Sequence, residues 1–182
     1  MLAPMRVDEG AVVAATFIPP FPIYPPETAW MREPKTDIPA MVLHNPGKAR
    51  VAYLPADIDR RFARENLPDH GDLLANVIRW AAGGGIPLAV EGRGLLDCHL
   101  YAQPGRLILH IVNLTSAAAW RAPVHELIPV GPLKVRVRLP EGARAAGVKL
   151  LVAGASAPAV VERGWVSFEC RSVLDHEVAV IG

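Results

Sequence analysis

The chain has 182 residues, of which 51% are apolar, and its 19 basic and 18 acidic residues nearly cancel. This length and composition allow a buried core, and the charge balance excludes a strong electrostatic attraction to nucleic acid or an anionic membrane. No apolar stretch approaches the roughly 20 residues of a membrane-spanning helix, and the amino terminus lacks the basic and apolar regions of an export signal. We therefore expect a cytoplasmic protein that binds neither nucleic acid nor membrane.

A proline-rich segment lies in the first third of the chain. Proline accounts for 18 residues, about twice its average frequency. The stretch IPPFPIYPPETAW at 18–30 cannot be helical, because each proline removes a donor and favours extended geometry in the residue before it. The interspersed Phe21, Ile23, Tyr24 and Trp30 favour an extended arm, packed on its own protein or on a neighbouring subunit, over a ligand for a proline-binding groove.

Three short strands are predicted in the first half. Segments 10–18, 40–44 and 49–54 are rich in β-branched residues, and Gly or Pro bounds several of their ends. The third is apolar on both faces, which predicts a buried strand. We expect it to end a partial α/β layer of flavodoxin-like type, with a polar loop and a helix after it.

That helix is predicted over residues 69–85. Asp69 is placed to cap its start, and the glycines at 83–85 are placed to stop it. Apolar residues at helical spacing predict one buried stripe, formed by Leu74, Val77, Ile78 and Ala81.

After residue 85 the pattern changes to strands alone. In 133–139 apolar residues alternate with Lys134, Arg136 and Arg138, which predicts one buried and one solvated face. Segment 106–114 is apolar on both faces and is predicted to be a central strand that follows a turn at 103–105. We expect an antiparallel β-sandwich over 86–182, with strands at 86–91, 95–102, 106–114, 133–139, 147–153, 157–162, 165–170 and 175–181.

A charged cluster follows the third predicted strand. Asp57 and Asp59, two residues apart in an extended stretch, would place both carboxylates on one side, where they could share a proton or a cation. Glycoside hydrolysis needs two carboxyl groups about 5–10 Å apart, and a metal would need further ligands. Arg60 and Arg61 would more simply pair with the aspartates. We interpret the cluster as structural, with a sugar or subunit contact as a further alternative.

The remaining motifs predict neither a metal nor a cofactor. The six histidines show no metal-ligand spacing, and there is no nucleophile elbow, phosphate-binding glycine loop or CxxC pair. Cys98 and Cys170 lie in predicted strands, which favours buried thiols over a disulfide. Asn113-Leu114-Thr115 matches a glycosylation acceptor, but it lies at a predicted strand in a chain without a visible export signal.

Two of the four tryptophans are candidate contact residues. Trp80 and Trp165 lie in predicted elements and are expected to pack. Trp30 and Trp120 lie in loop-like contexts, where a flat ring could stack on a sugar. We favour a core or interface role for both.

One resemblance covers nearly the whole chain. It is carried by residues 17–40, 50–81, 94–115, 125–142 and 173–181, with PADIDR and HIVNLT as its most specific stretches. These stretches resemble the carboxyl-terminal portion of large glycoside-hydrolase-like proteins. Such proteins have a (β/α)8 barrel, a β-galactosidase trimerisation-type domain of class I glutamine amidotransferase-like fold, and a small β domain.

The resemblance implies two domains and no catalytic machinery in this chain. Residues 1–84 would be a partial trimerisation-type α/β segment with the proline-rich arm, and 86–182 the terminal β-sandwich. The barrel, where these enzymes keep their acid and nucleophile, has no counterpart here.

We therefore expect a non-catalytic accessory or assembly region, which pairs with copies of itself or with a glycoside hydrolase barrel. The alternatives are a carbohydrate-binding module and a small glycoside hydrolase that uses Asp57 and Asp59.

Overall fold

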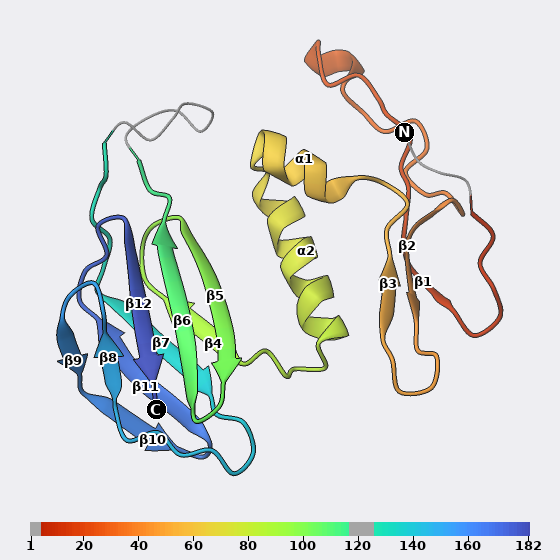
Figure 1. Cartoon of the computed structure of the whole chain (residues 1–182). Coiled ribbons are helices and arrows are strands. Elements are labelled where there is room, and N and C mark those ends of the chain that lie inside the picture. Colours follow the sequence, from red (N-terminus) through yellow and green to blue (C-terminus); the bar gives the residue numbers. More distant parts are fainter. Residues whose placement is uncertain (1–4, 117–125) are drawn as a thin grey trace. The chain divides into compact units, whose positions relative to one another are not determined.

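The computed structural model describes residues 5–116 and 126–182, and the chain divides into two units, Met1–Ile86 and Pro87–Gly182 (Figure 1). All strand pairs in the described residues are antiparallel, and helices are few. The fold is therefore mostly β, as the sequence predicts. Within the described ranges, every helix is too short or too polar to cross a membrane.

The first unit contains a three-stranded sheet in the order β1-β2-β3. Its strands lie within the predicted segments: β1 (Val12–Thr16), β2 (Pro39–His44) and β3 (Val51–Tyr53). Because β1 and β3 both run antiparallel to β2, the predicted flavodoxin-like layer, which would be parallel, is not shown by the described residues.

Two helices follow this sheet, one of them unexpected. The sequence predicts a polar loop before the main helix, but Ile58–Glu65 forms α1. The second helix, α2, spans Pro68–Ala81, and a single 3-10 turn, η1, lies at Pro26–Thr28. The helices pack closely at Gly71, where an added Cβ would lie 2.7 Å from the ring of Phe62.

The predicted cap of α2 is wrong by two residues. Leu67, not Asp69, is the N-cap residue, and no side chain caps the helix start. Pro68 explains the shift, because its fixed φ and missing N–H suit the first helical position. Asp69 lies in the first turn, and Gly83 follows the last turn with a positive φ of 63°.

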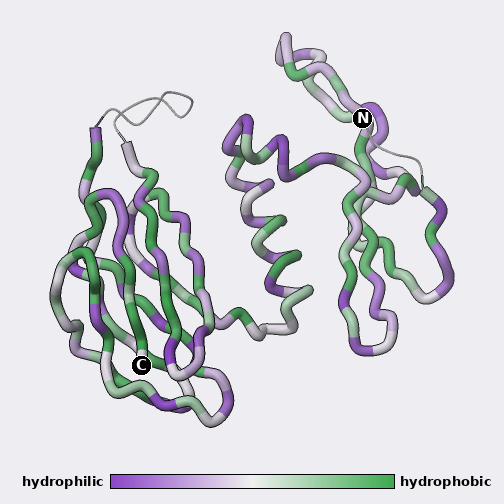
Figure 2. Tube along the Cα trace, viewed as in Figure 1, coloured by the Kyte–Doolittle hydropathy of each residue, from purple (hydrophilic) through white to green (hydrophobic). Residues whose placement is uncertain are grey.

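The first unit has almost no hydrophobic core of its own. Between residues 5 and 86, Val42 and Pro55 are the only buried residues. The predicted buried strand is wrong, since Val51 and Tyr53 are 46% and 51% exposed. The predicted buried stripe is also wrong within this chain, because Ile78 is 60% exposed and α2 buries no residue. Figure 2 shows hydrophobic positions along α2 and the three strands.

The second unit is an antiparallel β-sandwich. One sheet has the order β10-β11-β7-β4, and the other has the order β5-β6-β12-β8-β9. The strands of the first sheet are β4 (Leu88–Glu91), β7 (Leu133–Arg138), β10 (Ala159–Glu162) and β11 (Trp165–Cys170). Those of the second are β5 (Leu96–Gln103), β6 (Arg106–Asn113), β8 (Val148–Leu150), β9 (Ala155–Ala157) and β12 (His176–Ile181). The sequence-based prediction omits β9 as a separate strand.

Residues from both sheets form one continuous core. Leu109 and Ile111 from β6 meet Val135 and Val137 from β7, and all four are at most 1% exposed. Strand β7 alternates buried and exposed residues as predicted. The prediction that 106–114 is a central strand is confirmed, because β6 pairs with β5 on one side and β12 on the other.

Candidate functional site

The predicted charged cluster lies at the start of α1. Asp57 is the N-cap residue, and its Oδ2 lies 3.4 Å from Nε of Arg60. Arg61 pairs with Glu65 one turn further along, not with either aspartate. The extended geometry assumed for Asp57 and Asp59 is wrong, because Asp59 lies in the first helical turn.

This geometry suits a structural role for the cluster. Carboxylates at a helix N-terminus interact favourably with the helix dipole, and the pair between Arg60 and Asp57 spans one turn. The side chains are well exposed, 65% for Arg60 and 50% for Asp57. Within the described ranges, no three His, Cys, Asp or Glu residues are arranged to hold a metal ion. A sugar or subunit contact at this cluster stays a prediction.

The proline-rich arm is a loop between β1 and β2, closed at its base by a 2.8 Å hydrogen bond from the Phe17 N–H to the Ile38 carbonyl. Its tip is not packed on the described part of the chain, since Ile23 and Tyr24 are 84% and 80% exposed. Trp30 is 56% exposed, and the guanidinium of Arg32 lies 3.6 Å from its ring centroid. One face of the Trp30 ring is therefore already occupied.

The second candidate aromatic, Trp120, lies outside the described residues.

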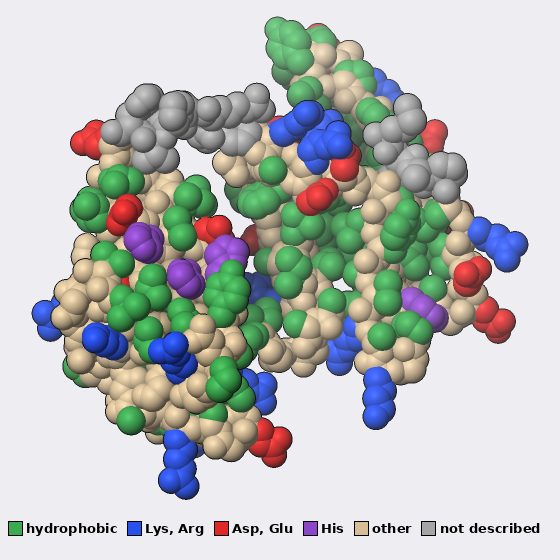
Figure 3. Space-filling model, in the orientation of Figure 1, with side chains coloured by type: hydrophobic (Ala, Val, Ile, Leu, Met, Phe, Trp, Pro, Cys, Tyr) green, Lys and Arg blue, Asp and Glu red, His purple; other side chains and the backbone are tan. Residues whose placement is uncertain are grey.

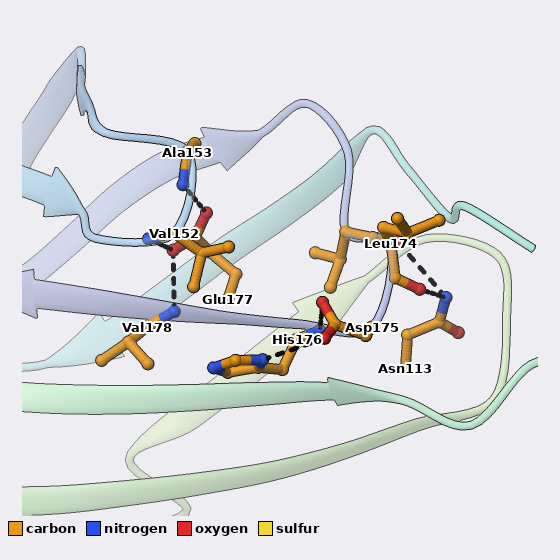
Figure 4. Close-up of polar contacts among 9 residues, drawn as sticks. Asn113, Val152, Ala153, Leu174, Asp175, His176, Glu177 and Val178 are labelled. Carbon is orange, nitrogen blue, oxygen red and sulfur yellow. Dashed lines mark hydrogen bonds and ion pairs between the residues drawn. The ribbon is translucent and has the colours of Figure 1, made fainter. Parts of the chain in front are cut away.

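Asn113 is a buried polar junction that the sequence-based analysis missed. It is 3% exposed, and its side-chain amide donates hydrogen bonds to the carbonyls of Ile128 and Leu174, both at 2.7 Å. Figure 4 shows the bond to Leu174. Its Oδ1 accepts from the Thr115 N–H at 2.9 Å. Because the amide nitrogen is buried and bonded, the Asn-Leu-Thr match is a structural motif in the folded chain and not an accessible acceptor.

Glu177 is a second buried polar group, 2% exposed on β12. Its carboxylate accepts three backbone N–H groups: Oε1 from Val152 at 2.9 Å and Val178 at 2.8 Å, and Oε2 from Ala153 at 3.0 Å (Figure 4). This carboxylate fixes the turn after β8 and lies beyond the reach of a substrate. An acidic residue at an inward position of the apolar strand 175–181 is the sequence signal for it.

A group of rings on the outer face of β5 and β6 was not predicted from the sequence. His99 and His110 are cross-strand partners, and Tyr101 follows His99 on the same face. The rings of His99 and Tyr101 lie 6.5 Å apart at 22°, and those of Tyr101 and His110 lie 5.7 Å apart at 90°. Asp97 Oδ1 lies 3.0 Å from His99 Nε2. Alternation in Asp-Cys-His-Leu-Tyr is the signal that places Asp97, His99 and Tyr101 together.

Both cysteines are free thiols, and Cys170 is buried as predicted, whereas Cys98 is only half-buried. Burial raises the pKa of the Cys98 thiol, with a smaller contribution from Asp97. Burial also raises the pKa of Cys170, with Glu177 adding to the effect. A raised pKa lowers the thiolate fraction at a given pH, and the thiolate is the reactive form.

We therefore expect slow labelling of both thiols by a disulfide reagent at pH 8. Cys170 should react more slowly than half-buried Cys98, since it is 1% exposed. Stopped-flow labelling checks this, with the chain in denaturant as the control in which both thiols react fast. Equal, rapid labelling of both in the folded chain would contradict the burial seen here.

The described structure defines a class of protein: an antiparallel β-sandwich preceded by a small α+β unit. No family model matches the sequence, and no curated protein matches it. Among solved structures, the chain is similar to α-L-fucosidase isoenzyme 2 from Paenibacillus thiaminolyticus, with a TM-score of 0.66 and 19% identity. That match covers 85% of this chain but 23% of the fucosidase.

A second match is much weaker. It is to a cycloisomaltooligosaccharide glucanotransferase from a Paenibacillus species, with a TM-score of 0.37 and 13% identity, and it covers 57% of this chain and 19% of that protein. At these identities the fucosidase likeness shows a shared fold, and the chain spans less than a quarter of that structure.

Proposed function

We propose that this chain is a non-catalytic accessory and assembly region of a glycoside-hydrolase-like protein. The first unit is the contact module, as in the β-galactosidase trimerisation-type domains that the sequence resembles, and the second unit is a terminal β domain. The partner is a further copy of the chain or a glycoside hydrolase barrel. A cytoplasmic location is part of this proposal.

The exposed apolar surface of the first unit carries this proposal. Soluble monomers rarely expose large contiguous apolar patches, and apolar surface gains about 25 cal/mol per Å² when it is covered. A unit of this size with two buried residues gains little free energy of folding from its own packing. A second surface that covers the apolar side chains would stabilise it. The exposed large apolar side chains of this unit are Val12, Val13, Ile23, Tyr24, Trp30, Met31, Ile38, Val51, Tyr53, Leu67, Ile78 and Ile86.

The fold likeness supports the carbohydrate context. The match to the fucosidase spans 85% of this chain and so includes residues of both units, yet only 23% of that larger protein is matched. A region of this size inside a glycoside hydrolase is consistent with an accessory part beside a separate catalytic domain. At the start of α1, Asp57 pairs with Arg60 and Arg61 pairs with Glu65, and all four side chains are exposed to solvent, which suits a structural role better than hydrolysis.

The test is the mass of the chain in solution together with amide exchange. We expect light scattering to give a mass above the 19.6 kDa of one chain, with amides of β1, β2 and α2 protected from exchange. The double change Ile23→Ser and Tyr24→Ser should lower the mass and that protection. Val160→Ser is the matched control, because Val160 is 65% exposed but lies in the second unit.

A monomer whose first unit is as well protected as its second would overturn the proposal, since that unit would then be stable without a partner. A monomer with an unprotected first unit would instead point to the barrel as the missing partner. Turnover of aryl glycosides that is lost on Asp57→Asn or Asp59→Asn would show that the chain is an enzyme.

A further inference from the structure

We propose that the outer face of strands β5, β6 and β12 binds a neutral sugar ring. This inference rests on the carbohydrate context of the proposed function, and it names the ligand class and the residues. The face belongs entirely to the second unit, and Figure 3 shows histidine side chains gathered on this unit.

The strand register places nine side chains on this face as three rows. The middle strand pairs with both neighbours without a shift, so each outward residue of β6 has one partner on β5 and one on β12. The rows run across the strands as Asp97, Val112 and His176, then His99, His110 and Val178, then Tyr101, Ile108 and Val180. Rings and short aliphatic side chains therefore fill one continuous patch, which we call the ring face.

The rings on this patch are held in place before any ligand arrives. Asp97 contacts Nε2 of His99, and the edge of one ring of the Tyr101–His110 pair meets the face of the other. The His99 and Tyr101 rings stack with their centroids 6.5 Å apart and their planes 22° apart, so a sugar would pack on the face of Tyr101 that is turned away from His99. Tyr101 is nevertheless 55% exposed. A fixed, exposed ring loses little conformational freedom when it binds.

The chemistry of the ring face matches a neutral sugar. The C–H groups on one side of a pyranose pack against an aromatic ring, and its hydroxyl groups need donors and acceptors at the rim. Tyr101 supplies a hydroxyl, Asp97 supplies a carboxylate, and His99 supplies a ring nitrogen. Lys and Arg are absent from the nine positions, and the cations that border them are Lys149, beside Val180, and Arg106, at the start of β6.

The outer face of the other sheet provides an internal comparison. There β7 presents Lys134, Arg136 and Arg138, and β11 presents Trp165, Ser167 and Glu169. The one ring among these residues, Trp165, has the guanidinium of Arg136 5.1 Å from its centroid, and charged side chains predominate, as on a solvated strand face. The ring face therefore differs from its counterpart in the same sandwich, although both belong to one core.

The experiment is a titration of the isotopically labelled full chain with methyl α-L-fucopyranoside, methyl β-D-galactopyranoside and methyl β-D-glucopyranoside in the millimolar range. We expect chemical shift changes in amides of β5, β6 and β12 for at least one sugar. Tyr101→Ala should weaken that binding about tenfold or more, as loss of a central aromatic contact does. Tyr101→Phe, which keeps the ring, should retain most of it.

Val160→Ala is the control, because Val160 is 65% exposed in the same unit but lies on β10 of the other sheet. An unchanged amide spectrum away from the site verifies that Tyr101→Ala folds. No shift with any of the three sugars, shifts confined to other elements, or equal losses in Val160→Ala would overturn the inference. Tyr101→Ala should leave the mass in solution unchanged, so a failure of sugar binding is distinguishable from a failure of the assembly proposal.

Discussion

Replacing Glu177 with glutamine is expected to destabilise the chain by about 2–4 kcal/mol, because three backbone N–H groups lose a charged acceptor in a buried place. The carboxylate accepts from Val152, Ala153 and Val178. A glutamine amide offers one oxygen, and its NH2 group would face N–H donors. The turn after β8 would then have to open or take in water.

Urea unfolding followed by tryptophan fluorescence measures this effect. Glu169→Gln is the matched control: Glu169 is an exposed acid on β11, and its change should alter the free energy of unfolding by less than about 0.5 kcal/mol. Equal effects of the two substitutions would show that the Glu177 contacts contribute nothing to stability.

Replacing Asn113 with alanine is the second change with a large expected effect. The side chain joins the end of β6 to the carbonyls of Ile128 and Leu174 and to the Thr115 N–H. Its loss removes this partner from three part-buried backbone groups, and a fully buried group left without a partner costs about 1–3 kcal/mol. We expect a loss of about 3 kcal/mol, because water can reach some of these groups.

Asn76→Ala provides the control, since Asn76 lies exposed on α2 and alanine favours helix. Thermal unfolding of both variants gives the comparison, and a lower melting temperature is expected for Asn113→Ala alone. A stable Asn113→Ala variant would mean that the loops at 128 and 174 are held by other contacts.

Asn113 and Glu177 lie next to residues of the ring face. Asn113 and Glu177 point inward from β6 and β12, and the residues beside them, Val112 and His176, point outward in the same row. A change at either inward group should therefore disturb the rings as well as the core. Sugar binding is best measured on variants of outward residues, which leave the inward contacts intact.

The strands of the second unit are predicted well because each has a local alternation of apolar and polar residues. In Leu133–Arg138 every second residue is apolar, and a period of two fixes both the strand and its buried face. The turn at Pro104-Gly105 was predicted for the same local reason, since Gly105 has a φ of 79°. Asn113 and Glu177 were missed because their partners come from distant segments, which no local pattern reveals.

The first unit shows the limit of pattern reasoning. Apolar spacing correctly predicts the helix that the structure has at Pro68–Ala81. Its apolar stripe is nevertheless exposed, because the spacing shows which face of the helix is apolar but not which surface covers that face. The parallel layer was inferred from the order of strand, loop and helix, whereas the structure pairs the strands as antiparallel neighbours. The Asp-Arg-rich sequence of α1 predicts a polar loop, and only the structure shows a helix there.

By itself, the sequence determined a mostly β chain and the identity of most strands. Only the tertiary structure decided the strand pairing, the inward polar contacts and the grouping of Asp97, His99, Tyr101 and His110 on one face. The physical reason is the distance along the chain over which each interaction acts. Backbone preferences and hydrophobic period act over a few residues, whereas register between strands and the satisfaction of buried polar groups depend on segments that meet only in the folded chain.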